Sequence, residues 1–172
     1  MNKGQQFYIG ILAFCLNAFC VSVNAQTPTD SLPNDPGSLR VFTIQNLSFG
    51  AFARGNNGGN IIISPSGSRS VTGDIIPLSL GFQFYNAIFE IESPPGNIIS
   101  ILFGPPAVLN GSNGGSITLN LGNSDPTSPF INNQAPPFRT QLNVGGTLVV
   151  GSLASAPPGS YSGLFYLTFN QE

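Results

Sequence analysis

The chain contains no histidine and no tryptophan, and both of its cysteines lie close to the amino terminus. Without histidine, neither a Ser-His-Asp triad nor a Cys-His nucleophile can be assembled. Zinc sites built from cysteine or histidine are excluded for the same reason. No calcium-loop motif is present either, because the acidic residues are dispersed along the sequence. The composition therefore predicts a protein that is not an enzyme and that holds no metal ion and no cofactor.

Charge is scarce as well. Charged residues make up 7% of the chain, whereas hydrophobic residues make up 41%. Apart from Lys3, the cations are four arginines, scattered from Arg40 to Arg139. Because they form no basic cluster in the sequence, we expect no nucleic-acid partner and no binding to anionic membrane surfaces. The polar surface must then be built from neutral residues, which protect a protein from association less well than charges do.

The amino-terminal segment has the pattern of a signal peptide. Lys3 precedes a long apolar run that ends in Val23-Asn24-Ala25, a combination of small and medium residues that a signal peptidase cleaves. We therefore expect residues 1–25 to be removed and the mature protein to be secreted, in the periplasm, at the cell surface or outside the cell. Cys15 and Cys20 each follow a phenylalanine, where a lipoprotein signal needs a small residue, so no lipid anchor is expected. Cleavage would leave no cysteine and no integral membrane segment.

The remainder of the sequence predicts a single β domain. Residues 26–38 are polar and contain three prolines, which is typical of an extended leader. Over residues 39–172, short apolar segments alternate with turns rich in glycine, proline and asparagine, and helical periodicity is missing. This pattern predicts an all-β, antiparallel, immunoglobulin-like β-sandwich. Strands are expected at residues 39–44, 47–52, 61–63, 69–72, 81–85, 87–92, 98–103, 116–121, 142–150 and 161–169.

Two β-hairpins are expected. The first would join the strands at 47–52 and 61–63 through a turn at Gly55–Gly59. A glycine-rich run can also cradle a phosphate, but that needs a following helix and usually a lysine, and neither is expected here. The second hairpin would lie within residues 145–172, with its loop at Ala156–Gly159.

The last strand has the clearest pattern in the chain. From Tyr161 to Phe169 every second residue is Tyr, Gly, Phe, Leu or Phe, so these residues form one apolar face. Sandwiches of this kind can assemble by adding a strand from a neighbouring molecule. We expect such pairing along this strand, at an edge marked by Tyr161, Phe165 and Phe169. The leader would be a poor donor, because its prolines lack the N–H groups of a ladder.

Several of these segments together carry a family resemblance. They are the stretches Leu47–Phe52, Ile63–Ser70 with Gly73, Val144–Leu148 and Gly159–Gly163, of which the last two are the most specific. On these stretches the chain resembles family 4402 of the bacterial domains of unknown function, over about Val41 to Asn170. The resemblance implies a secreted immunoglobulin-like or pilin-like sandwich, and it brings no catalytic residues with it.

A few residues remain as candidates for chemistry or binding. Glu90 and Glu92 lie two apart on a strand, about 6.5–7 Å from each other. An inverting glycosidase needs two carboxylates at about this distance, but paired charges on a wet strand face are common. Tyr85 and Tyr166 could offer an aromatic platform to a sugar, or pack at the rim of the core. Arg69 would either bind a glycan hydroxyl or pair with Asp74 or another acid.

Three functional hypotheses follow. The first is an exported, non-catalytic structural or adhesive module, similar to a fimbrial subunit, that associates with itself or with other cell-surface subunits. The second is a glycan-binding module that uses Tyr85 or Tyr166 together with asparagine and arginine groups from the loops, Arg69 among them. The third is a glycoside hydrolase that uses the acid pair Glu90 and Glu92.

Overall fold

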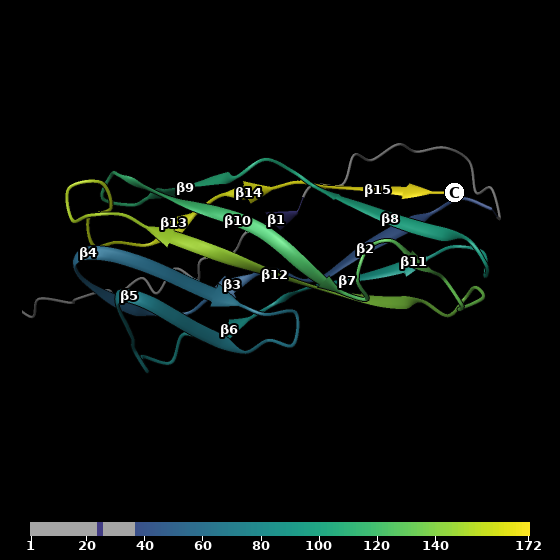
Figure 1. Ribbon diagram of the computed structural model, residues 1–172, viewed down its shortest axis with the longest axis horizontal. Helices are drawn as coiled ribbons and strands as arrows, with labels where there is room; N and C mark the ends of the chain where they lie inside the picture. The colour runs from purple at the N-terminus through teal and green to yellow at the C-terminus, as the bar shows by residue number, and fades with distance from the viewer. Residues whose placement is uncertain (1–23, 26–36) are drawn as a thin grey trace, which may run out of the picture.

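The computed structural model describes residues 24–25 and 37–172, and these residues form β-strands and turns (Figure 1). The predicted all-β, antiparallel β-sandwich is confirmed. Almost all of the expected signal peptide (1–25) and leader (26–38) lies outside the described residues. Within the part that the structure describes, no helix is long and apolar enough to cross a membrane.

The first sheet has eight strands, in which β13, β9, β10, β12, β4 and β5 follow one another, and the branch β7-β2 also starts at β12; its central part has the order β2-β7-β12-β10. The long strand β12 is its centre, because β10 pairs with one edge of β12 while β7 and β4 share the other. A hairpin of β4 and β5 extends the sheet beside the second half of β12. The bounds are β2 Arg40–Gln45, β7 Ala87–Glu92, β12 Thr140–Val150, β10 Ser116–Asp125, β4 Phe52–Ile63 and β5 Arg69–Pro77.

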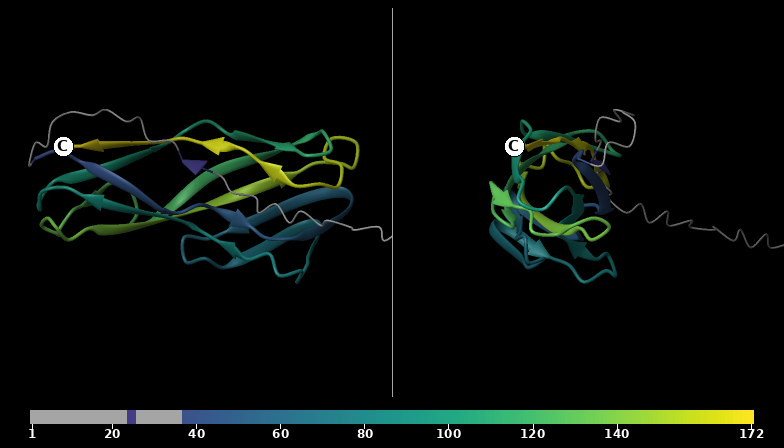
Figure 2. Two further views of the ribbon diagram at one scale, coloured as in Figure 1. Left: turned by 180° about the vertical axis from the view of Figure 1, so that it is seen from behind. Right: turned by 90° about the vertical axis from the view of Figure 1, so that its right-hand side faces the viewer.

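The second sheet has the order β11-β8-β15. Strand β9 continues β8 but pairs with β10, so the two sheets are joined along one side and the sandwich is curled (Figure 2). The chain ends as one extended run broken into β13, β14 and β15, of which β13 pairs with β9 and β15 with β8. The bounds are β11 Phe130–Ile131, β8 Ile98–Phe103, β9 Ala107–Gly111, β13 Tyr161–Ser162, β14 Leu164–Phe165 and β15 Leu167–Gln171.

The strand order identifies the type of sandwich. An immunoglobulin constant domain has seven strands, in the orders A-B-E-D and C-F-G. Strands β2, β7, β12 and β10 take the positions A, B, E and D, and β8 and β15 take C and F. Position A continues into β3 (Ser48–Phe49), which pairs with β6 (Phe84–Tyr85). No described strand takes position G beside β15, so this edge of the second sheet is open in the described structure.

Alternation of side chains builds the core, as the sequence predicts. In β7 the buried residues are Ala87, Phe89 and Ile91, and the residues between them are partly exposed. In the last strand Tyr161, Phe165 and Leu167 are buried, whereas their neighbours are exposed. The ring of Phe169 packs edge-on against that of Phe89, with centroids 6.0 Å apart, and so connects the two sheets.

The predicted turn at Gly55–Gly59 is wrong, because β4 runs through these residues as a bulged strand. The hairpin turn lies instead at residues 64–68, where the Gly67 N–H donates to the Ser64 carbonyl. Glycine is needed at 58 and 59 because neighbouring backbones approach closely on both sides. A Cβ on Gly58 would lie 2.1 Å from the carbonyl oxygen of Val150, and one on Gly59 would lie 2.1 Å from that of Thr72.

The predicted closing hairpin is also wrong. Strand β12 pairs with β10, β4 and β7 in the first sheet, whereas β13 pairs with β9 and β15 with β8. The loop at residues 151–160 therefore leads the chain from β12 across to β9 and does not return it beside β12. Side-chain alternation fixes which face of a strand is buried, but it does not identify the neighbouring strand.

Candidate functional site

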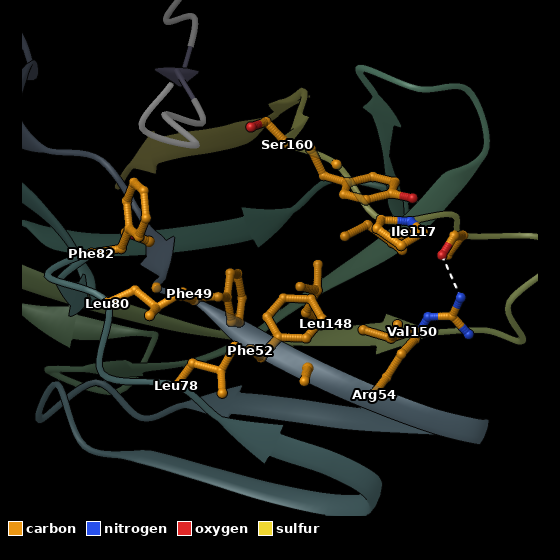
Figure 3. A pocket seen from close by; sticks show the side chains of 18 of the residues that line it. Phe49, Phe52, Arg54, Leu78, Leu80, Phe82, Ile117, Leu148, Val150 and Ser160 are labelled. Carbon is orange, nitrogen blue, oxygen red and sulfur yellow. Dashed lines mark hydrogen bonds between the residues drawn. The ribbon is translucent and has the colours of Figure 1, made fainter. Parts of the chain in front are cut away.

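The described structure has an apolar pocket of about 640 Å³ at the β13 end of the sandwich (Figure 3). One wall is formed by β3, the start of β4 and the loop at residues 78–83, and the opposite wall by residues 153–161. The pocket therefore lies between position A of the first sheet and the beginning of position F. Its apolar lining includes Phe49, Phe52, Leu78, Leu80, Phe82, Leu109, Ile117, Leu148, Val150 and Leu153.

Arg69 fixes the first wall. Its Nη1 donates to the carbonyl oxygens of Phe49 at 3.1 Å and Ala51 at 3.3 Å. Its guanidinium lies over the ring of Phe84, 4.3 Å from the ring centroid. The link between β3 and β4 is thus held by a charge-assisted network and a cation–π contact, which keeps Phe49 and Phe52 directed into the pocket (Figure 3).

Arg54 fixes the second wall. Its Nη1 donates to the carbonyl oxygen of Gly151 at 3.1 Å. Its Nη2 donates to the carbonyl oxygen of Ala156 at 2.6 Å, the bond that is dashed in Figure 3. Tyr161, which is buried, donates its hydroxyl to the carbonyl of Pro157. Burial raises the pKa of Tyr161 above its usual value, and the positive charge of Arg54 opposes part of that rise. The crossing loop is therefore tied to β4 and to β13.

Among the described residues, β15 has backbone hydrogen-bonding groups on the side away from β8 that no strand pairs. In an antiparallel pair, residues alternate between those bonded to the partner strand and those whose N–H and C=O point away. The Gly104 N–H donates to the Tyr166 carbonyl, and Glu172 exchanges both bonds with Ile98, so the even-numbered residues of β15 face β8. The odd-numbered residues Leu167 and Phe169 therefore turn their N–H and C=O groups to the open edge.

The same alternation holds at β13. The Ser112 N–H donates to the Ser160 carbonyl, so Tyr161, the next residue, turns its own N–H and C=O away from β9. The side chains of Tyr161, Phe165 and Phe169, which mark the predicted edge, therefore point into the core. At Tyr161 and Phe169 the backbone N–H and C=O groups point to the open edge of the sheet.

Part of this edge carries a partner in the described structure. Strand β1, Asn24–Ala25, pairs in parallel with β14, with Asn24 opposite Leu164 and Ala25 opposite Phe165 (Figure 2). These two residues fall at the end of the expected signal peptide. The pairing shows that β14 can accept a strand on the side away from β9.

The three candidate glycan contacts do not form one site. Tyr85 lines the pocket, whereas Tyr166 is 52% exposed, lies between β14 and β15, and is outside the pocket lining. Arg69 contacts backbone carbonyls and a ring, and among the described residues no carboxylate pairs with it. The expected partner Asp74 instead accepts hydrogen bonds from the backbone and side chain of Asn57.

The acid pair Glu90 and Glu92 is held by arginines on the outer face of the first sheet. Arg139 contacts Glu90 at 3.0 Å and Glu92 at 3.2 Å, and Arg40 contacts Glu92 at 3.4 Å. The Arg139 guanidinium also lies 3.7 Å from the ring centroid of Phe42. Hydrogen bonds to the two glutamates raise the pKa of Arg139. Neither glutamate lines the pocket. The contacts therefore favour a structural role for the pair, as part of an ion network on the outer face of the sheet.

Sequence reasoning missed the pocket and the role of Arg54. The available signals were an arginine inside a glycine-rich run of a charge-poor chain and the apolar stretch from Leu78 to Phe82. Neither signal identifies the partner of these residues, because Arg54 contacts a loop about a hundred positions further along the chain. In the described part of the chain, no group of three or more acidic or cysteine residues is arranged to hold a metal ion.

The comparisons with known proteins give a family and no structural neighbour. The chain matches no curated protein and no solved structure. The model of one family, the domain of unknown function DUF4402, matches residues 39–170 and so covers both sheets and the pocket. The chain therefore belongs to the DUF4402 family of domains of unknown function.

Proposed function

We propose that the protein is an exported, non-catalytic structural or adhesive module that joins a surface assembly by accepting a strand at the open edge of β13–β15. The observation that carries this proposal is the position beside β15, where the seventh strand of an immunoglobulin-like sandwich would lie and no described strand is found. Pairing of an added strand with an exposed sheet edge is a common mode of recognition between proteins.

The edge lacks the features that usually protect one. Edge strands are commonly blunted by lysine, by proline or by inward-pointing charges. From Tyr161 to Gln171 the chain has no charged residue and no proline. Leu164 and Tyr166, which lie along this run, are 40% and 52% exposed. Such an edge favours pairing with another strand.

Removal of the signal peptide during export would open this edge in the mature protein. Cleavage after Ala25 would remove β1, the segment that pairs with β14. The backbone groups of β14 would then join those of Tyr161, Leu167 and Phe169 along one unpaired edge. Maturation would thus create the acceptor, and a surface assembly would then be the setting in which it is filled.

Hydrogen exchange on the mature protein, residues 26–172, tests the open edge. The N–H groups of Leu167 and Phe169 are expected to exchange fast, whereas that of Thr168, which faces β8, is expected to be protected. A second protein carries an extension after Glu172, consisting of an Asn-Gly turn and about ten alternating threonine and valine residues that can form a hairpin with β15. It is expected to melt at a higher temperature and to protect Leu167 and Phe169.

An extension of equal length made of glycine and serine is the control, and it is expected to change neither quantity. Protection of Leu167 and Phe169 in the unextended mature protein would mean that the edge is already filled. An alternating extension that adds no protection would mean that the edge accepts no strand. Either result would overturn the proposal.

A glycan-binding function is the second candidate, and its support is the exposed ring of Tyr166. Aromatic rings exposed on a sheet can stack on sugars. A glycan array with the mature protein tests it, with Tyr166→Ala as the variant expected to lose binding and Tyr85→Ala as a pocket variant for comparison. Binding that survives both changes would remove these residues from the hypothesis.

A further inference from the structure

The pocket is too large to be an ordinary packing defect. Protein interiors are close-packed, with few voids larger than a water molecule. A cavity of about 150 Å³, such as truncation of one leucine leaves, can bind a small apolar molecule. The volume of about 640 Å³ therefore has room for about four large aliphatic side chains. Its lining is apolar on the floor and on both walls, so apolar groups are its natural contents.

The location of the pocket relates it to the open edge. Tyr161 contributes its side chain to the pocket lining and turns its backbone N–H and C=O away from β9. A strand that paired with β13 would send every second side chain toward the interior. Those side chains would enter the space between β13 and β3, which the pocket occupies.

From these relations we propose that the acceptor edge binds an extended segment of a different protein, which runs parallel to β13–β14 and places large apolar side chains, at alternate positions, in the pocket. This inference rests on the proposed function and names the partner of the same edge. The direction follows from β1, which pairs with β14 in parallel. A strand that pairs with β14 in this direction and extends further toward its own amino terminus would lie beside β13 and the pocket.

A second copy of this chain has no unpaired segment with alternating large apolar residues among its expected leader and its described strands. The expected mature leader, residues 26–38, is polar and has prolines at 28, 33 and 36, which cannot donate to a ladder. Within residues 26–38, Leu32 is the one large aliphatic residue. The apolar strands of the described domain are already paired within its sheets. A donor with alternating large apolar residues and no proline must therefore come from another polypeptide.

A synthetic peptide tests the proposal on the mature protein. The peptide has about twelve residues, with leucine and threonine alternating and a lysine at each end, and its binding is followed by fluorescence anisotropy. We expect saturable binding, and binding at least tenfold weaker for a peptide with the same composition but with its leucines placed side by side. A peptide with prolines at the threonine positions is expected to bind no better than this scrambled peptide.

The variant Val150→Phe tests the pocket itself. Val150 is buried and lines the pocket, so a larger side chain would fill part of the space that the donor needs. We expect binding to fall at least tenfold. The matched control is Val149→Phe, on the same strand but 39% exposed and outside the lining, which is expected to bind like the unmodified protein. Circular dichroism and melting confirm that both variants are folded.

Spin labels test the direction, because the mature protein has no cysteine of its own. Single labels at Ser162→Cys and Thr168→Cys, both at exposed positions, are combined with peptides isotope-labelled at one end. A parallel donor brings its amino-terminal end near residue 162 and its carboxyl-terminal end near residue 168. The reverse pattern would overturn the parallel direction.

The outcomes separate the two proposals. Peptide binding that Val150→Phe leaves unchanged would overturn the pocket inference but not the open edge. Self-association of the mature protein, without peptide binding and abolished by the alternating carboxyl-terminal extension, would make a second copy the occupant and also overturn the inference. An edge that neither a peptide nor the extension can fill would overturn the proposed function itself.

Discussion

Arg54 donates a hydrogen bond from Nη2 to the carbonyl oxygen of Ala156 at 2.6 Å, across 102 positions of the sequence. A second bond runs from Nη1 to the Gly151 carbonyl at 3.1 Å. One side chain on β4 therefore holds the loop that leads from β12 to β13, and this loop forms a wall of the pocket. The strength of that attachment can be measured directly.

Replacing Arg54 with alanine is expected to lower the free energy of unfolding by about 2 kcal/mol, since hydrogen bonds to a charged group contribute about 1.5–3 kcal/mol. Urea denaturation measures this loss, and hydrogen exchange is expected to accelerate at residues 151–157. Arg54→Lys should recover only part of the stability, because an ammonium lacks the planar fork that reaches two carbonyls. Equal stability of the alanine variant and the unmodified protein would show that the loop is held by other contacts.

The raised pKa of Tyr161 leads us to expect that the free energy of unfolding falls in alkaline solution. Its pKa is raised by burial, so the folded state retains the phenolic proton more tightly than the unfolded state, whose pKa is about 10. The resulting stability is fully present below about pH 10 and is lost as the pH rises through the folded-state pKa. Urea denaturation between pH 8 and 11 measures this decline. Tyr161→Phe is expected to flatten it, whereas Tyr166→Phe, at an exposed position, should leave it unchanged.

Asn132 connects two turns at the far end of the sandwich. It is fully buried, its Nδ2 donates to the carbonyls of Ser93 and Gln134 at 2.6 and 2.9 Å, and its Oδ1 accepts from Thr140 at 2.6 Å. Asn132→Ala would leave buried groups without partners, so we expect a loss of about 3 kcal/mol in the free energy of unfolding. Asn133→Ala, at the exposed neighbouring position, is expected to have little effect. Similar losses in the two variants would contradict this role.

Gly145 is expected to tolerate no side chain. A Cβ at this position would lie 2.4 Å from the carbonyl oxygen of Ile63, where β12 changes its partner from β7 to β4. Gly145→Ala should therefore cost about 1–3 kcal/mol, the usual range for overpacking. Gly122→Ala is the matched control, because nothing lies within 4 Å of a Cβ there. Thermal melting compares the two variants, and a stable Gly145→Ala protein would contradict the close approach.

The ion network of Arg139 is expected to be weak and sensitive to salt, because its guanidinium and Glu90 are each about a third exposed. Arg139→Ala should lower the melting temperature less than Arg54→Ala does. The difference from the unmodified protein should shrink in 1 M sodium chloride, where the screening length is about 3 Å. An effect that persists at high salt would point instead to packing of the guanidinium on Phe42.

Local sequence pattern predicted much of the fold. The strands at 87–92 and 98–103 have the predicted bounds, and the inward residues of the last strand are the predicted odd-numbered ones. The errors fall where neighbours in space decide the structure. Gly55–Gly59 looks like a turn, but glycine is needed there because two other backbones come close. Tyr85 and Tyr166 are alternative candidates chosen by residue type, and the fold places only Tyr85 in the pocket lining.

The amino-acid sequence by itself determined that this chain forms strands, which of their faces are buried, and that, without histidine, no catalytic site can depend on that residue. These properties depend on side-chain type and on alternation along the chain, and both can be read locally. The tertiary structure alone decided that β12 and β13 are not neighbours, that no described strand lies beside β15, and that a pocket lies behind β13. Strand pairing is a contact between distant segments, and alternation restricts the buried face of a strand without specifying its partner.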